Sequence, residues 1–144
     1  RRMGLHTAVS DGALQISAAG TILVGENGFL DASGGPGGNA WGGGGGGGSG
    51  GAILLEAATV SLAGTVHAAG GKGGNGCSPW NNSGAGGYAG GLTDGPTWGG
   101  GGATESGAGG GASGRIRINT LPQGLTISGT IQPALDSGCA TSTE

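Results

Sequence analysis

Apolar and polar residues alternate with a period of two in short segments, and these segments recur in the same order three times along the chain. Each repeat opens with an apolar–x–apolar unit, at 14–16, 53–55 and 116–118. A second alternating unit follows at 22–24, 60–62 and 125–127, and then a glycine at Gly28, Gly64 and Gly129. Because this alternation places successive side chains on opposite faces of a strand, the pattern predicts β-strands in three related blocks.

The predicted fold class is all-β, with short strands stacked as in a β-solenoid or a sandwich. We expect one domain over residues 1–144, with blocks at about 13–33, 52–69 and 115–133. The first block carries two extra residues before its glycine. Alternate side chains of the blocks are expected to face a narrow interior: Leu14, Ile16, Ile53, Leu55, Val60, Leu62, Ile116, Ile118, Leu125 and Ile127.

Two glycine-rich arms, 34–51 and 70–114, separate the blocks, and the first contains an unbroken run from Gly42 to Gly48. Such segments are usually flexible linkers. The ordered alternative is the extended left-handed three-fold helix, whose outward N–H and C=O groups can bond to neighbouring segments of the same kind. Aromatic residues within the arms favour order: Trp41, Trp80, Tyr88 and Trp98. We therefore expect the arms, with Gly44 and Gly46, to lie in close backbone contacts between subunits or beside the blocks.

Composition explains why such contacts are needed. The chain has 42 Gly and 5 Pro among 144 residues, a content typical of disordered chains. Ordering a backbone costs roughly 1–2 kcal/mol per residue, and glycine loses the most freedom. Only 3% of the residues are aromatic, which excludes a thick globular core. Dense backbone hydrogen bonding, burial against other chains and cross-links remain as compensation.

The low charge and the short apolar stretches argue against nucleic acid as a partner and against a membrane helix. Only 9% of the residues are charged and the net charge is -3, which does not suit nucleic acid but favours association with like surfaces. No apolar stretch approaches the ~20 residues of a membrane helix. The chain opens with Arg1-Arg2 and no signal peptide, so we expect a processed or partial product.

Cys77 and Cys139 lie far apart in the sequence, outside any CxxC spacing, and we interpret them as a disulfide of an extracellular protein; two free thiols are the alternative. His6 and His67 have no cysteine or carboxylate cluster beside them, so no metal site is predicted. The carboxylates are scattered, and no motif indicates catalysis or a cofactor. Asn81 begins an Asn-Asn-Ser sequence that matches the pattern for N-glycosylation.

The run 42–48, the segment 49–57 that follows it and the later segment 62–71 resemble the glycine-rich repeats of large secreted bacterial surface proteins. The resemblance covers about 13–133 and implies β-solenoid coils interrupted by glycine-rich insertions. The long glycine run is also similar, more weakly, to the polyglycine helix bundles of some phage tail-fibre adhesins and of a springtail antifreeze protein. Neither resemblance implies a catalytic residue.

The function that these features favour is a structural subunit of an extracellular filament or surface layer, with copies of itself as partners. The alternative is an adhesin module that binds surface glycans or a receptor through Trp80, Tyr88 and Trp98. Ice binding needs a longer regular array than the two aligned threonine pairs, Thr21 with Thr59 and Thr65 with Thr130. An enzyme is the least favoured class.

Overall fold

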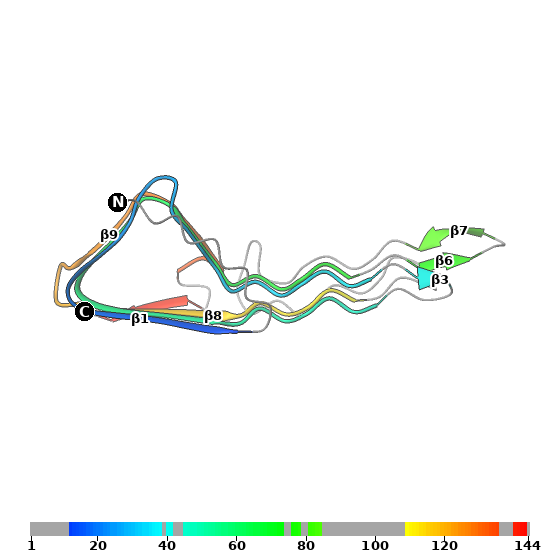
Figure 1. Ribbon diagram of the computed structural model, residues 1–144, viewed down its shortest axis with the longest axis horizontal. Coiled ribbons are helices and arrows are strands. Elements are labelled where there is room, and N and C mark those ends of the chain that lie inside the picture. The colour runs from blue at the N-terminus through cyan, green and yellow to red at the C-terminus, as the bar shows by residue number, and fades with distance from the viewer. Residues whose placement is uncertain are drawn as a thin grey trace.

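The computed structural model describes residues 12–38, 40–41, 45–73, 76–78, 81–84, 109–135 and 140–143. Within these residues the regular structure consists of eleven β-strands and no helix, which confirms the prediction of an all-β chain. One end of the molecule is a bundle of strands with a triangular outline. Paired extended segments run from this bundle to a smaller group of strands at the opposite end (Figure 1).

Each block forms strands at the predicted places. The first block forms β1 (Ala13–Val24) and β2 (Phe29–Asp31), and the second forms β4 (Ala52–Leu62) and β5 (Thr65–His67). The third block forms β8 (Arg115–Asn119), β9 (Leu125–Ile127) and β10 (Thr130–Gln132). The first and second units of a repeat are thus one continuous strand in the first two blocks and two strands in the third.

A turn explains why the long strand is divided in the third block. Pro122 has no N–H to give to a ladder, so a strand cannot continue through it. Gln123 adopts a left-handed backbone with φ of 61°, and the Gly124 N–H donates to the Leu121 carbonyl at 2.8 Å. In the first block the strand continues, with an irregularity in its register between Ala18 and Thr21.

Strands of successive blocks pair in parallel, so that equivalent residues of the repeats stack in rows. One sheet has the order β1-β4-β8-β11 with β9 also on β4, and a second has the order β10-β5-β2. The registers follow the repeat alignment made from the sequence. They produce five apolar rows: Leu14–Ile53–Ile116, Ile16–Leu55–Ile118, Ile22–Val60–Leu125, Val24–Leu62–Ile127 and Leu30–Val66–Ile131.

These rows form the core, but their burial depends on the block. In the middle block Ile53, Leu55 and Val66 are 1%, 0% and 0% exposed. Their first-block counterparts Leu14, Ile16 and Leu30 are only partly buried, because no described strand lies beyond β1 and β2, although Ile22 and Val24 of β1 are only 7% exposed. The prediction of a shared interior face is therefore confirmed for the middle block and for Ile116 and Ile118 of the third block, but it is wrong for Ile127, which is 36% exposed.

The predicted glycine of each block lies at a corner where the backbones approach closely. A Cβ added at Gly64 would lie 2.2 Å from the Gly28 carbonyl oxygen, and one at Gly129 would lie 1.9 Å from the Gly64 carbonyl oxygen. Side chains are thus excluded from this row. The first block turns here through a bond from the Gly28 N–H to the Gly25 carbonyl, which accommodates its two extra residues.

Four extended segments leave or enter the blocks, and we call 32–38 and 68–73 the outward arms and 45–51 and 109–114 the return arms. They run side by side in two layers (Figure 1). Between the first outward arm and the first return arm, bonds recur every third residue. The donors Gly45, Gly48 and Gly51 meet the carbonyls of Gly38, Gly35 and Ala32 at 2.8, 2.8 and 2.7 Å.

Other bonds join neighbouring arms with the same step. Gly34 and Gly37 of the first outward arm donate to Ala69 and Lys72 of the second, both at 2.8 Å. Gly47 and Gly50 of the first return arm donate to Gly109 and Ala112 of the second, at 3.0 and 2.9 Å. Gly111 and Gly114 donate to Gly71 and Ala68 at 2.8 and 2.6 Å. The described residues of the four arms are therefore joined to one another by backbone hydrogen bonds.

Four short strands complete the description. β3 (Ala40–Trp41), β6 (Gly76–Ser78) and β7 (Asn81–Gly84) form a sheet at the far end of the arms, within the ranges predicted as glycine-rich arms (Figure 1). β11 (Ala140–Thr143) lies at the other end of the molecule, paired in parallel with β8.

Candidate functional site

A row of polar side chains crosses the outer face of the large sheet and centres on Glu56 of β4. Its carboxylate oxygen Oε2 accepts hydrogen bonds from Gln15 Nε2 at 3.2 Å and from Ser17 Oγ at 3.1 Å. Its other oxygen, Oε1, accepts one from Asn119 Nδ2 at 2.9 Å. The bonds from Asn119 and then Ser17 hold the pKa of Glu56 below its ordinary value. Glu56 is therefore ionised at neutral pH and is not a proton donor.

Asn119 extends this row to the C-terminal strand. Its Oδ1 atom accepts hydrogen bonds from Arg117 Nε at 3.0 Å and from Thr143 Oγ1 at 2.7 Å. The row thus ties β1, β4, β8 and β11 together through side chains of four neighbouring strands. Sequence reasoning missed it, although Ser17, Glu56 and Asn119 occupy the same position of the three repeats.

The two threonine pairs considered for ice binding are neighbours in the sheets. Thr21 and Thr59 share a hydrogen bond of 2.6 Å between their hydroxyl oxygens. Thr65 and Thr130 are register partners, but the third member of their row is Phe29. The Phe29 ring meets the His67 ring edge-on at a centroid distance of 5.3 Å. His67 lies beside an aromatic ring, and in the described part of the chain no three His, Cys, Asp or Glu side chains gather where they could hold a metal ion.

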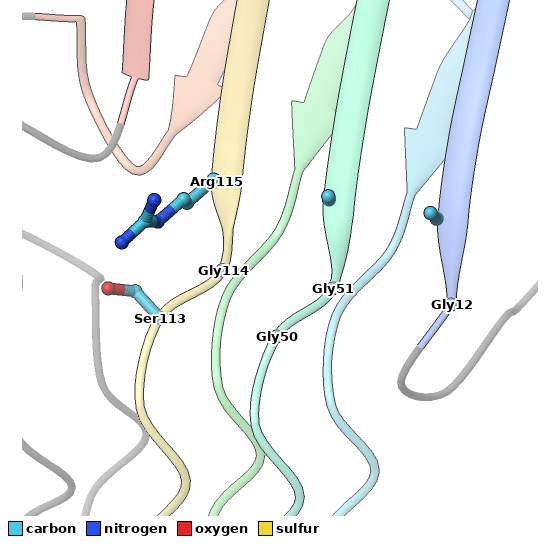
Figure 2. A pocket seen from close by; sticks show the side chains of 8 residues that line it. Gly12, Gly50, Gly51, Ser113, Gly114 and Arg115 are labelled. Carbon is cyan, nitrogen blue, oxygen red and sulfur yellow. The ribbon is translucent and has the colours of Figure 1, made fainter.

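An open depression of about 390 Å³ lies where the large sheet meets the return arms. It is lined by 12–13, 50–52 and 113–115, the equivalent junction of each block. Four of the eight lining residues are glycine, and the side chains of Arg115 and Ser113 project beside the glycine backbone (Figure 2). Among the described residues that line it, Arg115 is the one charged side chain.

Large exposed apolar side chains lie in the two end blocks; sequence reasoning did not single out three of them, and it expected the fourth, Ile127, to face the interior. Leu23 is 71% exposed and Phe29 is 46% exposed in the first block. Leu121 is 62% exposed and Ile127 is 36% exposed in the third block. Among the described residues of the second block, no large apolar side chain is exposed to this extent. The apolar surface of the blocks is thus concentrated at the two ends of the stack.

Most of the predicted arm residues lie wholly or partly outside the part of the chain that the structure describes. The backbones of Trp41, Cys77 and Asn81 belong to β3, β6 and β7, but their side chains lie outside the described part. Wholly outside it lie His6, Gly44, Trp80, Tyr88, Trp98 and Cys139. The disulfide, the glycosylation site and the aromatic contacts of the adhesin alternative therefore stay predictions. Gly46 is exposed, and a Cβ there would lie 3.9 Å from the Gly109 carbonyl oxygen, so Gly46 has no close backbone contact within the chain and its contact between subunits stays a prediction.

The described residues contain no helix long and apolar enough to cross a membrane. Comparison with known proteins adds nothing to this picture, because no family model, no curated protein and no solved structure matches the chain.

Proposed function

We propose that this chain is a structural subunit that stacks end to end with copies of itself in an extracellular filament or surface layer. In this proposal the blocks are the coils of a short β-solenoid, and the glycine arms are polyglycine helices that project from it. The observation that carries the proposal is the position of the exposed apolar side chains, which lie in the first and last blocks and not in the middle one. A repeat stack buries each rung between two neighbours, so its end rungs favour another copy.

The partly buried rows of the first block support the same proposal. Leu14, Ile16 and Leu30 occupy the positions that Ile53, Leu55 and Val66 fill in the buried middle block. Burying apolar surface contributes about 25 cal/mol per Å², so a neighbouring rung would stabilise these side chains as it does those of the middle block. A second copy supplies strands with the matching period.

The hydrogen bonding of the arms supports the polyglycine helix. A three-fold helix presents every third residue to the same neighbour, and the arms exchange bonds at steps of three residues. The close approach of the arm backbones supports the same helix. A Cβ at Gly47 would lie 2.1 Å from the Gly71 carbonyl oxygen, and one at Gly111 would lie 1.8 Å from the Gly48 carbonyl oxygen. The extracellular setting rests on Cys77 and Cys139 in the sequence alone.

Leu23 provides the test, because it is exposed and its middle-block register partner is Ser61. Leu23→Glu should weaken self-association, measured by sedimentation velocity over a range of concentrations, and should shorten any filaments seen by negative-stain imaging. Ser61→Glu adds the same charge to the middle of the same row and should change association little. A wild-type chain that stays monomeric at every concentration, or equal association of the two variants, contradicts the proposal.

A further inference from the structure

β11 occupies the place of a fourth rung beside the third block. Its register pairs Ala140 with Ile116, Thr141 with Arg117 and Ser142 with Ile118. The Thr120 N–H donates to the Thr143 carbonyl at 2.9 Å, and the Thr143 hydroxyl donates to Asn119. β11 therefore covers the edge of β8 that would otherwise be open to another strand.

β11 is a poor match for the rungs beneath it. Every block places a pair of large aliphatic residues in the first two apolar rows, whereas β11 has Ala140 and Ser142 in register with Ile116 and Ile118. It pairs with β8 over four positions, while β1 pairs with β4 over ten. Next to it, β9 and β10 have no further strand on this side among the described residues, and Ile127 is left 36% exposed.

We infer that the β8 edge beneath β11 is an acceptor site for β1 of a second copy, and that β11 is displaced when the copies stack. The inference rests on the proposed stacking function and names its interface. β1 is an end strand whose Leu14 and Ile16 repeat the positions of Ile116 and Ile118, and it is long enough to continue along β9. Strand addition to a sheet edge is a common mode of recognition, with main-chain bonds for affinity and alternate side chains for specificity.

Because β11 and an incoming β1 would occupy the same level beside β8, only one of them can bind. β11 has the advantage of belonging to the same chain, which gives it an effective concentration of order millimolar. The incoming strand has the advantage of more pairs and larger apolar side chains. β11 thus delays stacking at low protein concentration and gives way at high local concentration.

Removal of residues 140–144 tests this competition. The shortened chain should associate at a concentration at least about tenfold lower than the full chain in sedimentation velocity, because its acceptor edge no longer carries a competitor. If circular dichroism shows that the shortened chain is unfolded, Thr141→Pro in the full chain replaces it. Proline removes one N–H of β11 and leaves the third block unchanged.

A cysteine pair locates the contact. Gln15 and Arg117 are both exposed and share a repeat register, so Gln15→Cys with Arg117→Cys should cross-link two copies when β1 of one lies on β8 of the other. Within one chain β4 lies between these strands, which separates them by about 9–10 Å, too far for a disulfide. Ser17→Cys with Arg115→Cys is the control, because it is out of register by four residues. Peptide mapping identifies the linked residues.

The inference is supported if the first cysteine pair forms a cross-link between copies and the control pair does not. The cross-link should also form faster in the shortened chain than in the full chain. Equal association of full and shortened chains overturns the role of β11 but leaves the stacking function intact. Association without the expected cross-link overturns the assignment of β1 and β8. Monomers in both chains overturn the inference and the proposed function together.

Discussion

The blocks and the glycine arms are both held by backbone hydrogen bonds, yet they depend on opposite properties of the side chain. In the blocks every second residue fills an interior, and Leu55 is completely buried there. In the arms every third residue bonds the same neighbour, and Gly71 lies where a Cβ would come within 1.9 Å of the Gly35 carbonyl oxygen. The blocks are stabilised by burial of their side chains, whereas the arms depend on the close backbone approach that glycine permits because it has no side chain.

This difference in side-chain burial determines how stable the blocks and the arms are relative to each other. A hydrogen bond contributes about 1 kcal/mol net, while fixing a residue costs roughly 1–2 kcal/mol. In the four arms only the alanines at their bases, such as Ala32 and Ala68, join the apolar core, so little burial offsets that difference, and the arms are stabilised by their attachment to the blocks and by neighbouring arms. We therefore expect the arms to open locally well before the blocks unfold. The following variants test this difference between the two regions.

The largest effect is expected from Leu55→Asp, which buries a carboxylate without a partner in the core of the middle block. The cost should be about 4 kcal/mol or more, enough to unfold the chain. Leu54→Asp is the control, since Leu54 is the next residue of β4 and points to the outer face. Urea unfolding measures both, and similar midpoints would show that the interior face has been misassigned.

A matched pair in the arms should have the next largest effect. Gly71→Ala places a methyl group against backbone and should destabilise the arms by about 1–3 kcal/mol. Gly35→Ala changes the equivalent residue of the first outward arm, where a Cβ would have nothing within 4 Å, and should be neutral or stabilise by about 0.5 kcal/mol. Hydrogen exchange of the Gly48 and Gly111 amides reports the difference. Equal exchange in the two variants would mean that the arms are not packed.

Glu56 supplies a smaller, pH-dependent effect in the blocks. Its folded-state pKa is lowered, so its contribution to stability is present above the unfolded value of about 4.3 and is lost as the pH falls through the folded value. Glu56→Gln should therefore reduce the loss of stability between neutral and acid pH. Thermal unfolding at a series of pH values measures this, with Glu26→Gln in the exposed corner as control. An unchanged acid limb in Glu56→Gln would exclude the carboxylate as a source of acid sensitivity.

The smallest effect is expected from Gly46→Ala. Gly46 is exposed and a Cβ there reaches only van der Waals distance from the Gly109 carbonyl oxygen, so unfolding stability should change by less than about 0.5 kcal/mol. Any loss of self-association in this variant, measured by sedimentation, would then report a contact between copies. Unchanged association places the stacking contacts in the blocks.

The sequence predicts the blocks well because large apolar side chains recur at every second position in them. Ile53 and Leu55 have equivalents in both other repeats, and aligning the repeats is enough to obtain the parallel register. The arms are different, since consecutive glycines carry no mark of which residue faces which neighbour. The pairing of Gly48 with Gly35 and of Gly111 with Gly71 depends on the spatial order of the arms and could not be obtained from the sequence.

The candidate surfaces were harder to predict for a related reason. Leu23 and Phe29 occupy the same rows as Ser61 and Thr65, on the outward face of their strands, and nothing in the shared pattern marks these rows as apolar. β11 was missed because 140–143 contains no large apolar residue to mark a strand. The Glu56 row was accessible in principle, since Ser17, Glu56 and Asn119 align, but three different residue types do not form an evident motif.

The hydrogen bonds between parallel and antiparallel arms have a mechanical consequence. The bonds run crosswise to the arms and are repeated along their length. Tension applied along the arms shears all of these bonds together, so that they resist as a group. A force applied sideways at the far end, where β3, β6 and β7 lie, peels the arms apart and breaks the bonds one after another. We therefore expect the molecule to resist extension along its length more strongly than separation of the arms from the far end.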